Sequence, residues 1–160
     1  MEHWETAVES FTKKWSDKDN VEGFLVCGSY VTGSPSKRSD IDLHIVLSSG
    51  VDWRERGAEM IDGYLIEYFV NSPSQIKVYF EDDFRKNRKH AAHMFSSGKI
   101  LLDRNGILEE LKSEAVKWIG KEYPNLNEVT VELNKYALWD CLDNLQDAYE
   151  SESKSFTYAY

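Results

Sequence analysis

The sequence predicts an α+β fold of the α/β type: a mixed β-sheet flanked by helices, with a helical C-terminal appendage. Three observations predict it. An amphipathic helical pattern opens the chain, short apolar runs of strand-like composition follow it, and helical patterns end it. Helices and strands that alternate in this way are typical of a sheet with helices packed on its faces. A chain of 160 residues is long enough for one domain with a buried core and a small appendage.

The first elements are a helix and four strands, with a hairpin turn between the last two strands. Apolar side chains at helical spacing predict an amphipathic N-terminal helix with the core residues Trp4, Ala7, Val8, Phe11 and Trp15. Apolar runs at 24–27 and 41–47 predict the first two strands. A third, polar strand is expected over 52–61. Asp62-Gly63 is a strong hairpin signal, and it leads into the apolar and aromatic run 64–70.

The remaining elements are mostly helical. Ser72-Pro73-Ser74 marks a helix start, and apolar residues follow it at helical spacing: Ile76, Tyr79, Phe80 and Phe84. A short last strand is expected over 98–103. Two helices follow, over 108–119 and 129–145, on either side of a break at Tyr123-Pro124-Asn125.

These elements group into two parts, a domain over 1–104 and a helical region over 105–160. The helical region ends in three aromatic residues, Phe156, Tyr158 and Tyr160. Exposed aromatics of this kind indicate a contact surface. We expect either that they pack on a neighbour, which leaves a homodimer open, or that the helical region is the start of a larger helical domain.

Composition narrows the classes of function. A net charge of −9 argues against a nucleic-acid polymer as partner, because binding a phosphate backbone needs basic surface. It is compatible with a cationic small molecule, or simply with solubility. No apolar run approaches membrane-spanning length, and the N-terminus lacks a signal-peptide pattern. Cys27 and Cys141 lie in apolar contexts and are predicted to be buried thiols, so we expect a cytoplasmic protein that does not bind membranes.

The turn between the first two strands is a candidate phosphate site. Gly28 allows backbone geometry that other residues resist, and successive backbone N–H groups in such a turn form a concave anion nest. The hydroxyl of Ser29 can donate to a phosphate oxygen. An ordinary Gly-Ser turn is the alternative, and no Gly-Lys-Ser/Thr of a Walker A loop follows. We also assign Lys37 and Arg38, in the same segment, to the nucleotide-binding residues.

Two aspartates follow this turn at the start of the second strand. Side chains at i and i+2 of a strand point to one face, so Asp40 and Asp42 project together while Ile41 and Leu43 project to the core. Adjacent like charges on a strand repel, and a cation turns that repulsion into attraction. Magnesium prefers carboxylates, waters and phosphate oxygens. The alternative is a solvated sheet face.

Glu67 is a candidate third carboxylate of a two-metal site. It is the only charge in the apolar run 64–70, and a lone carboxylate there is costly unless a cation satisfies it. The alternative is that Glu67 lies on an exposed face or pairs with an Arg or Lys.

The residues allow more than one interpretation of the basic cluster and of each of three histidines. The cluster 85–90 is either a solvated helix end or a wall that attracts phosphates. His90 and His93 are spaced for zinc on a helix but lack a third ligand, so packing or surface roles are favoured. His44 shares the face of the two aspartates, where it lines the site or hydrogen-bonds behind it.

Residues 28–43 resemble the signature of the nucleotidyltransferase superfamily related to DNA polymerase beta: Gly-Ser, a spacer, Asp-x-Asp on a strand, then a distant acid on a neighbouring strand. Ser39-Asp40-Ile41-Asp42-Leu43 carries the Asp-x-Asp core. The resemblance covers roughly the first hundred residues and implies that 1–104 is a catalytic domain of the nucleotidyltransferase fold. It implies that Gly28 and Ser29 hold the triphosphate and that Asp40, Asp42 and Glu67 bind Mg²⁺ and carry catalysis.

Within the superfamily the chain is similar to the small bacterial enzymes of the kanamycin- and lincosamide-nucleotidyltransferase type. That resemblance implies transfer of a nucleoside monophosphate from Mg-NTP, with ATP expected, to a hydroxyl of an aminoglycoside- or lincosamide-like acceptor, and hence antibiotic resistance. The alternative is a minimal nucleotidyltransferase antitoxin, which binds or adenylylates a partner protein.

Overall fold

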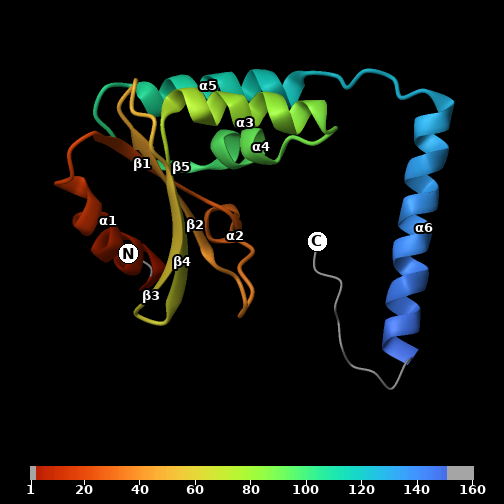
Figure 1. The fold of residues 1–160 in the computed structure, drawn as a ribbon. Coiled ribbons are helices and arrows are strands. Elements are labelled where there is room, and N and C mark those ends of the chain that lie inside the picture. Colours follow the sequence, from red (N-terminus) through yellow and green to blue (C-terminus); the bar gives the residue numbers. More distant parts are fainter. Residues whose placement is uncertain (1–2, 151–160) are drawn as a thin grey trace. The chain divides into compact units, whose positions relative to one another are not determined.

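The structure, a computed structural model, describes residues 3–150. By contacts it divides into two compact units, Met1–Glu122 and Tyr123–Tyr160. The first unit holds one five-stranded sheet in the order β3-β4-β2-β1-β5 (Figure 1). The strands are β1 Val21–Cys27, β2 Ile41–Leu47, β3 Glu55–Ile61, β4 Tyr64–Asn71 and β5 Lys99–Asp103.

The sheet is mixed, which confirms the predicted fold class. β1 pairs antiparallel with both β2 and β5, and β3 pairs antiparallel with β4. The central β2 and β4 run parallel, and their register pairs Asp42 with Glu67. The parallel pair therefore brings two of the predicted site carboxylates onto neighbouring strands.

The β3–β4 hairpin turns at the predicted dipeptide. Asp62 and Gly63 both have positive φ, of 50° and 84°, as the two central residues of a type I′ turn do. The strand before the turn is shorter than predicted: its pairing begins at Glu55, three residues after the expected start at Asp52. Arg54, just outside the ladder, donates instead to the Tyr79 hydroxyl at 3.3 Å.

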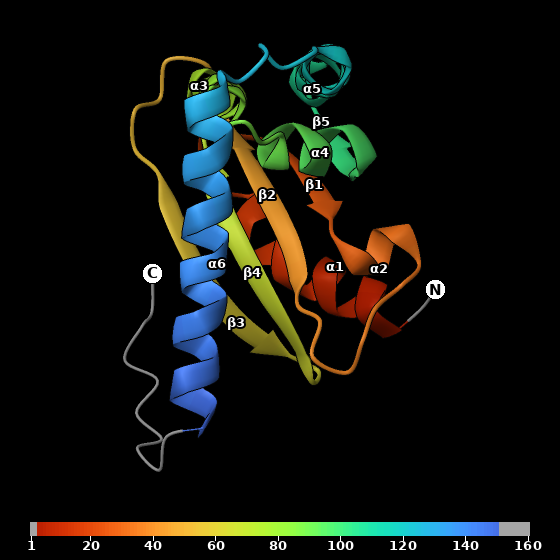
Figure 2. The ribbon, with the colours of Figure 1, turned by 90° about the vertical axis from the view of Figure 1, so that its right-hand side faces the viewer.

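Helices cover the two faces of the sheet, and Figure 2 shows α1 behind the strands. Because successive side chains of a strand point to opposite faces, the buried apolar residues form two clusters, one on each face. On one face α1 (His3–Ser16) buries the five predicted core residues, and all of them except Ala7 belong to a cluster with alternate residues of β1, β2 and β4. On the other face lie α3 (Pro73–Arg85), α4 (His90–Ser97) and α5 (Ile107–Gly120), which pack together over Leu25, Cys27 and Val46.

The start of α3 is set by local signals. Ser72 is the N-cap, and its side chain accepts from the backbone N–H of Gln75, while Pro73 occupies the first helical position. A serine cap satisfies one of the free N–H groups of the first turn, and proline there loses no hydrogen bond. The predicted helix start is therefore confirmed.

The second unit contains α6 (Glu128–Glu150), and none of its described residues is buried. Cys27 is buried, as predicted, but Cys141 is exposed. That part of the prediction is wrong, because its apolar neighbours on α6, such as Leu138 and Leu142, are themselves 67% and 65% exposed. Phe156, Tyr158 and Tyr160 lie outside the described residues, and the boundary placed at residue 104 stays a prediction.

Within residues 3–150, no helix combines the length and the apolar character that crossing a membrane requires.

Candidate active site

Three carboxylates of the first unit lie close together at β2 and β4, two neighbouring interior strands of the sheet. Asp42 lies on β2 and Glu67 opposite it on β4, while Asp40 immediately precedes β2. One carboxylate oxygen of each lies within 4.8 Å of the others. All three residues are partly buried. Oxygens this close repel one another unless a cation lies between them, so the arrangement fits a divalent metal such as Mg²⁺.

Alternation along the strands produces this convergence. Ile41 and Leu43 flank Asp42 and are fully buried in the α1-side core. Ile66, the neighbour of Glu67, joins the same cluster. Because successive side chains of a strand point to opposite faces, the two acids face the other side, toward α3 and α4.

The Gly28 turn approaches Asp42 from the opposite strand. Gly28 has φ +85°, and a Cβ at this position would lie 2.6 Å from Oδ2 of Asp42. A side chain is therefore disfavoured both by the left-handed backbone and by the carboxylate. Ser29 begins the short helix α2 (Ser29–Thr32), which Gly33 ends in the left-handed conformation. Gly28 thus lies beside Asp42 on the β1 side, with β4 and Glu67 on the other side of β2.

A cleft of about 680 Å³ lies on the Glu67 side of the carboxylates. Residues of β2, β4, α3 and α4 line it, together with Arg54, Glu55 and Arg56 at the start of β3. Gly28, Ser29 and Asp40 are not among its lining residues. The carboxylates therefore stand between a glycine turn and an open cleft.

Sequence reasoning missed the roles of Arg54, Arg56, Asn71 and Tyr79 at this cleft. Arg56 donates to Oε1 of Glu67 from Nη2 at 2.6 Å and from Nε at 3.2 Å. Tyr79, which accepts from Arg54, donates to the Asn71 side chain at 3.2 Å. Glu67 thus combines both interpretations made from sequence: it joins the carboxylate cluster and pairs with an arginine.

The basic cluster 85–90 contributes Arg88 and His90 to the cleft wall. The Nε of Arg88 lies 2.7 Å from Oδ1 of the buried Asp83, whose Oδ2 accepts from the backbone N–H of Ala91. Asp83 therefore fixes the connection between α3 and α4. His90 and His93 are exposed, and neither belongs to a metal-binding group among the described residues.

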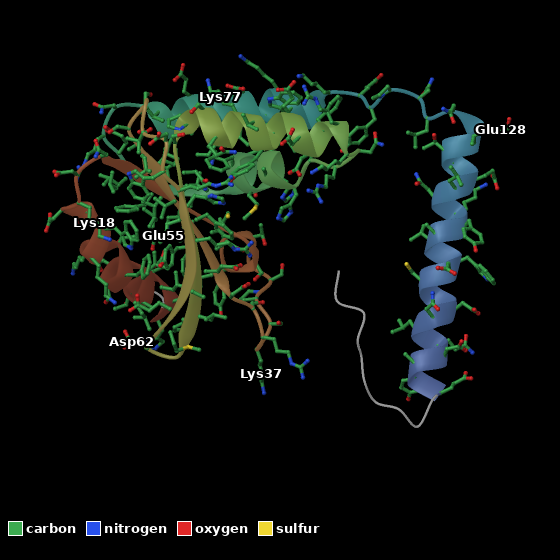
Figure 3. The ribbon with its side chains drawn as sticks, viewed as in Figure 1. Lys18, Lys37, Glu55, Asp62, Lys77 and Glu128 are labelled. Carbon is green, nitrogen blue, oxygen red and sulfur yellow. The ribbon has the colours of Figure 1, made fainter. Side chains whose placement is uncertain are left out.

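Lys37 and Arg38 lie on the exposed loop between α2 and β2. Figure 3 shows Lys37 at the tip of this loop, extending away from the sheet. Neither residue lines the cleft. Their assignment to nucleotide binding stays a prediction.

The environment of Asp42 favours its protonated form. Burial, followed by the charges of Asp40 and Glu67, raises the pKa of Asp42 to about 6, although the charges of His90 and Arg56 oppose the shift. A neighbouring thiol shows the same effects: burial, then the charge of Asp42, raises the pKa of Cys27. The site is therefore short of positive charge without a metal.

His44 lines the cleft beside these acids. Its ring stacks on Phe69, with centroids 5.1 Å apart, and tilts against Phe95 at 4.7 Å. Burial, then the charge of His90, lowers the pKa of His44 to about 4. Neither ring nitrogen has a hydrogen-bond partner among the described residues. His44 is thus a neutral part of the cleft floor, as the first of its two interpretations has it.

We expect Asp42→Asn to stabilise the metal-free protein. A carboxyl whose pKa is raised on folding binds more protons in the native state, so stability falls as pH rises from about 4 to 6. Asparagine does not ionise, so the variant does not lose this stability as the pH rises. Since Asp42 is only half buried, solvent screening leaves a gain of about 1 kcal/mol at neutral pH, or about 2–4 °C in Tm.

Thermal melting in EDTA at pH 4.5 and pH 7.5 checks this expectation. The difference between variant and parent should be small at the lower pH and positive at the higher one. A large drop in Tm at both values would show instead that Asp42 is structural.

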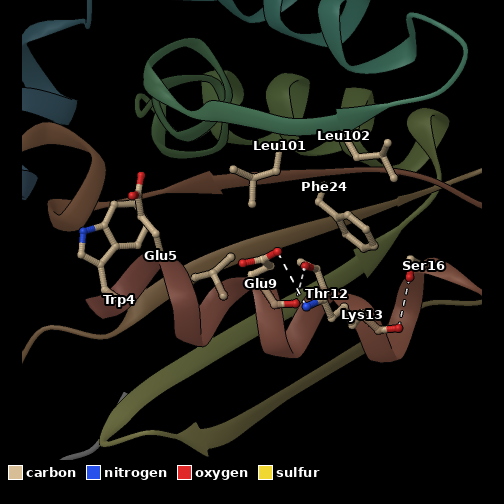
Figure 4. Close-up of a pocket in the computed structure, with 10 residues that line it drawn as sticks. Trp4, Glu5, Glu9, Thr12, Lys13, Ser16, Phe24, Leu101 and Leu102 are labelled. Atoms are coloured by element: carbon tan, nitrogen blue, oxygen red, sulfur yellow. Dashed lines mark hydrogen bonds and ion pairs between the residues drawn. The ribbon is translucent and has the colours of Figure 1, made fainter. Parts of the chain in front are cut away.

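A second hollow, of about 410 Å³, lies on the opposite face between α1 and strands β1 and β5. Figure 4 shows Phe24, Leu101 and Leu102 lining it, with Glu9 and Lys13 of α1 below them. Its lining is largely apolar, and the sheet separates it from the carboxylates.

Comparisons with known proteins agree with this geometry. Residues 7–118 match the family model described as nucleotidyltransferase domain. The crystal structure of a nucleotidyltransferase-like protein from Exiguobacterium sibiricum 255-15 superposes with a TM-score of 0.53 at 14% sequence identity. The match covers 76% of this chain but 40% of that chain, so the likeness concerns the fold of the shared part. None of the curated proteins compared with the chain matches it.

Proposed function

We propose, from the premise that the chain belongs to the nucleotidyltransferase domain family, that it transfers the nucleoside monophosphate of Mg-ATP to a hydroxyl group of a small acceptor. Membership of that family makes the chain a nucleotidyltransferase. The proposal adds the metal, the nucleotide and the acceptor class, which is aminoglycoside- or lincosamide-like. It also assigns Asp40, Asp42 and Glu67 as the metal ligands.

The observation that carries the proposal is the mutual approach of three carboxylate oxygens to within 4.8 Å. A magnesium pair bound there would lower the pKa of the acceptor hydroxyl and neutralise charge on the phosphates. The protein's own contribution is positioning: Asp40 and Asp42 present adjacent oxygens, and Glu67 presents a third from the neighbouring strand. Such catalysis depends mostly on orientation and charge compensation, and no side chain has to form a covalent intermediate.

From the order of the strands we assign a side to each substrate. Gly28 flanks Asp42 on the β1 side, where the backbone N–H groups of the turn and the hydroxyl of Ser29 suit a triphosphate. The cleft opens on the β4 side, beyond Glu67. The acceptor then enters the cleft, and its hydroxyl reaches the α-phosphorus across the carboxylates. Attack there, in line with the leaving group, releases pyrophosphate.

The acceptor class has two supports. The net charge of −9 suits a cationic small molecule better than a nucleic-acid polymer. A cleft of about 680 Å³ is within the range of pockets that hold small molecules. The resemblance to kanamycin- and lincosamide-type enzymes agrees with both.

The test is transfer of label from α-³²P-ATP with Mg²⁺, with and without a panel of aminoglycosides and lincosamides. We expect acceptor-dependent pyrophosphate release and a labelled small product. Label found on protein would show instead that the acceptor is a protein and not a small molecule. No pyrophosphate release with any of the four NTPs and any acceptor would overturn the proposal for this chain.

A further inference from the structure

Arg56, on the edge strand β3, forms an ion pair with Glu67 of the carboxylate cluster. We infer that Arg56 is a positioning residue: its guanidinium holds one oxygen of Glu67 so that the other faces Asp40 and Asp42. The inference rests on the proposed function, because it takes Glu67 as a metal ligand. It concerns a side chain that neither the signature motif nor the family match singles out.

The contact between the two side chains is directional. Nε and Nη2 of Arg56 both donate to Oε1 of Glu67, at 3.2 and 2.6 Å. Two donors on the same oxygen restrain the position of Oε1, and with it the rotation of the carboxylate about the Cγ–Cδ bond. Among the described residues, no donor bonds to Oε2 of Glu67, so this oxygen remains available to a cation.

The guanidinium is itself held in place. Register pairs Arg56 with Phe69 and Ala58 with Glu67, so Arg56 reaches Glu67 along the diagonal of the hairpin. Its guanidinium carbon lies 4.9 Å from the centroid of the Phe69 ring, a cation–π contact. Although the Arg56 side chain is 68% exposed, Glu67 is only 26% exposed. A mobile surface arginine would fix its partner poorly, and the Phe69 contact reduces that mobility.

The contact between Arg56 and Glu67 could affect metal binding in two opposite ways. Whether removal of Arg56 weakens or strengthens metal binding therefore shows which role the arginine has. Carboxylate ligands are usually hydrogen-bonded by an outer partner, and loss of that partner costs about 10–100-fold in metal affinity or activity. A positive charge beside a cation site has the reverse effect, because it repels the metal. If Arg56 positions Glu67, its removal weakens metal binding. If Arg56 only competes with the metal, its removal strengthens binding.

Lysine at this position distinguishes geometry from charge. Lysine retains the positive charge but offers a single rotating ammonium in place of a planar fork. It cannot donate to Oε1 from two nitrogens in one plane while stacking on Phe69. A positioning role therefore predicts that Arg56→Lys recovers only part of the affinity lost in Arg56→Gln.

The experiment measures Mn²⁺ binding to the nucleotide-free protein by the EPR signal of free Mn²⁺, which needs no catalytic turnover. The variants are Arg56→Gln, Arg56→Lys and Asp42→Asn, with Lys14→Gln as the matched control. Lys14 of α1 pairs with Glu59, also on β3, so the control removes one positive charge from an ion pair on the same strand. Circular dichroism and thermal melting verify that every variant is folded.

We expect Arg56→Gln to weaken Mn²⁺ binding about 10-fold, Arg56→Lys to fall between it and the parent, and Lys14→Gln to match the parent. Unchanged or tighter binding by Arg56→Gln would overturn the positioning role, as would full recovery by Arg56→Lys. A failure of the proposed function is distinguishable, because Asp42→Asn would then bind Mn²⁺ as the parent does.

Discussion

Asp42→Asn should reduce nucleotidyl transfer by at least about 10³-fold while the protein remains folded. Metal-ion stabilisation of transition-state charge contributes several kcal/mol, and each 1.36 kcal/mol is a factor of ten in rate. Asp42 stands at the centre of the cluster, between the Gly28 turn and Glu67. Asparagine keeps its shape but removes the charge that a divalent cation requires. The rate of pyrophosphate release under saturating Mg-ATP measures the effect.

The matched control for this loss is Asp62→Asn. Asp62 has φ 50° in the hairpin turn and is exposed, and asparagine is equally suited to a type I′ turn. This variant removes the same charge from the same unit but should retain the parent's rate. A comparable loss in both variants would attribute the effect to net charge, and activity retained in Asp42→Asn would remove Asp42 from the reaction.

Much of the fold could be predicted from short sequence motifs that determine the structure of their own segment. Asp62-Gly63 predicts both the turn type and the pairing of β3 with β4, because a two-residue turn sets the register of its hairpin. The parallel pairing of β2 with β4 has no such signal, since the two strands are separated in sequence by β3. The same holds for β5, which joins the sheet beside β1 across a long separation in sequence. Nothing local decides which edge a distant strand joins.

The candidate site divides in the same way. The period of a strand suffices to place Asp40 and Asp42 on one face, and the lone charge of Glu67 marks it as unusual among apolar neighbours. Arg56 was overlooked although the turn at Asp62-Gly63 places it opposite Phe69, diagonal to Glu67; carrying the hairpin register through would have found it. The contact of Arg54 with Tyr79 could not be found in this way, because it depends on how α3 packs against the sheet.

The second large effect expected is the dependence of nucleotide binding on metal. The clustered carboxylates repel one another and also repel a triphosphate. Burial, followed by the charges of Asp40 and Glu67, raises the pKa of Asp42 to about 6. We therefore expect ATP in EDTA to leave the Tm unchanged. ATP with Mg²⁺ at about 100 times its Kd should add about 2.7 kcal/mol by ligand linkage, which corresponds to about 5–11 °C for a domain of this size.

Two variants connect this stabilisation to particular groups. Asp40→Ala should abolish it, because the proposed metal site would lose a ligand and the described residues offer no further carboxylate in the cluster. Ser29→Ala should only reduce it, because the proposed hydroxyl contact is lost and the backbone N–H groups of the Gly28 turn remain. Differential scanning fluorimetry with ATP and EDTA, ATP and Mg²⁺, and Mg²⁺ alone separates the contributions. Equal stabilisation by ATP in EDTA and in Mg²⁺ would show that the triphosphate binds without the carboxylates, and the assignment of Asp40, Asp42 and Glu67 as a metal site that serves the nucleotide would then fail.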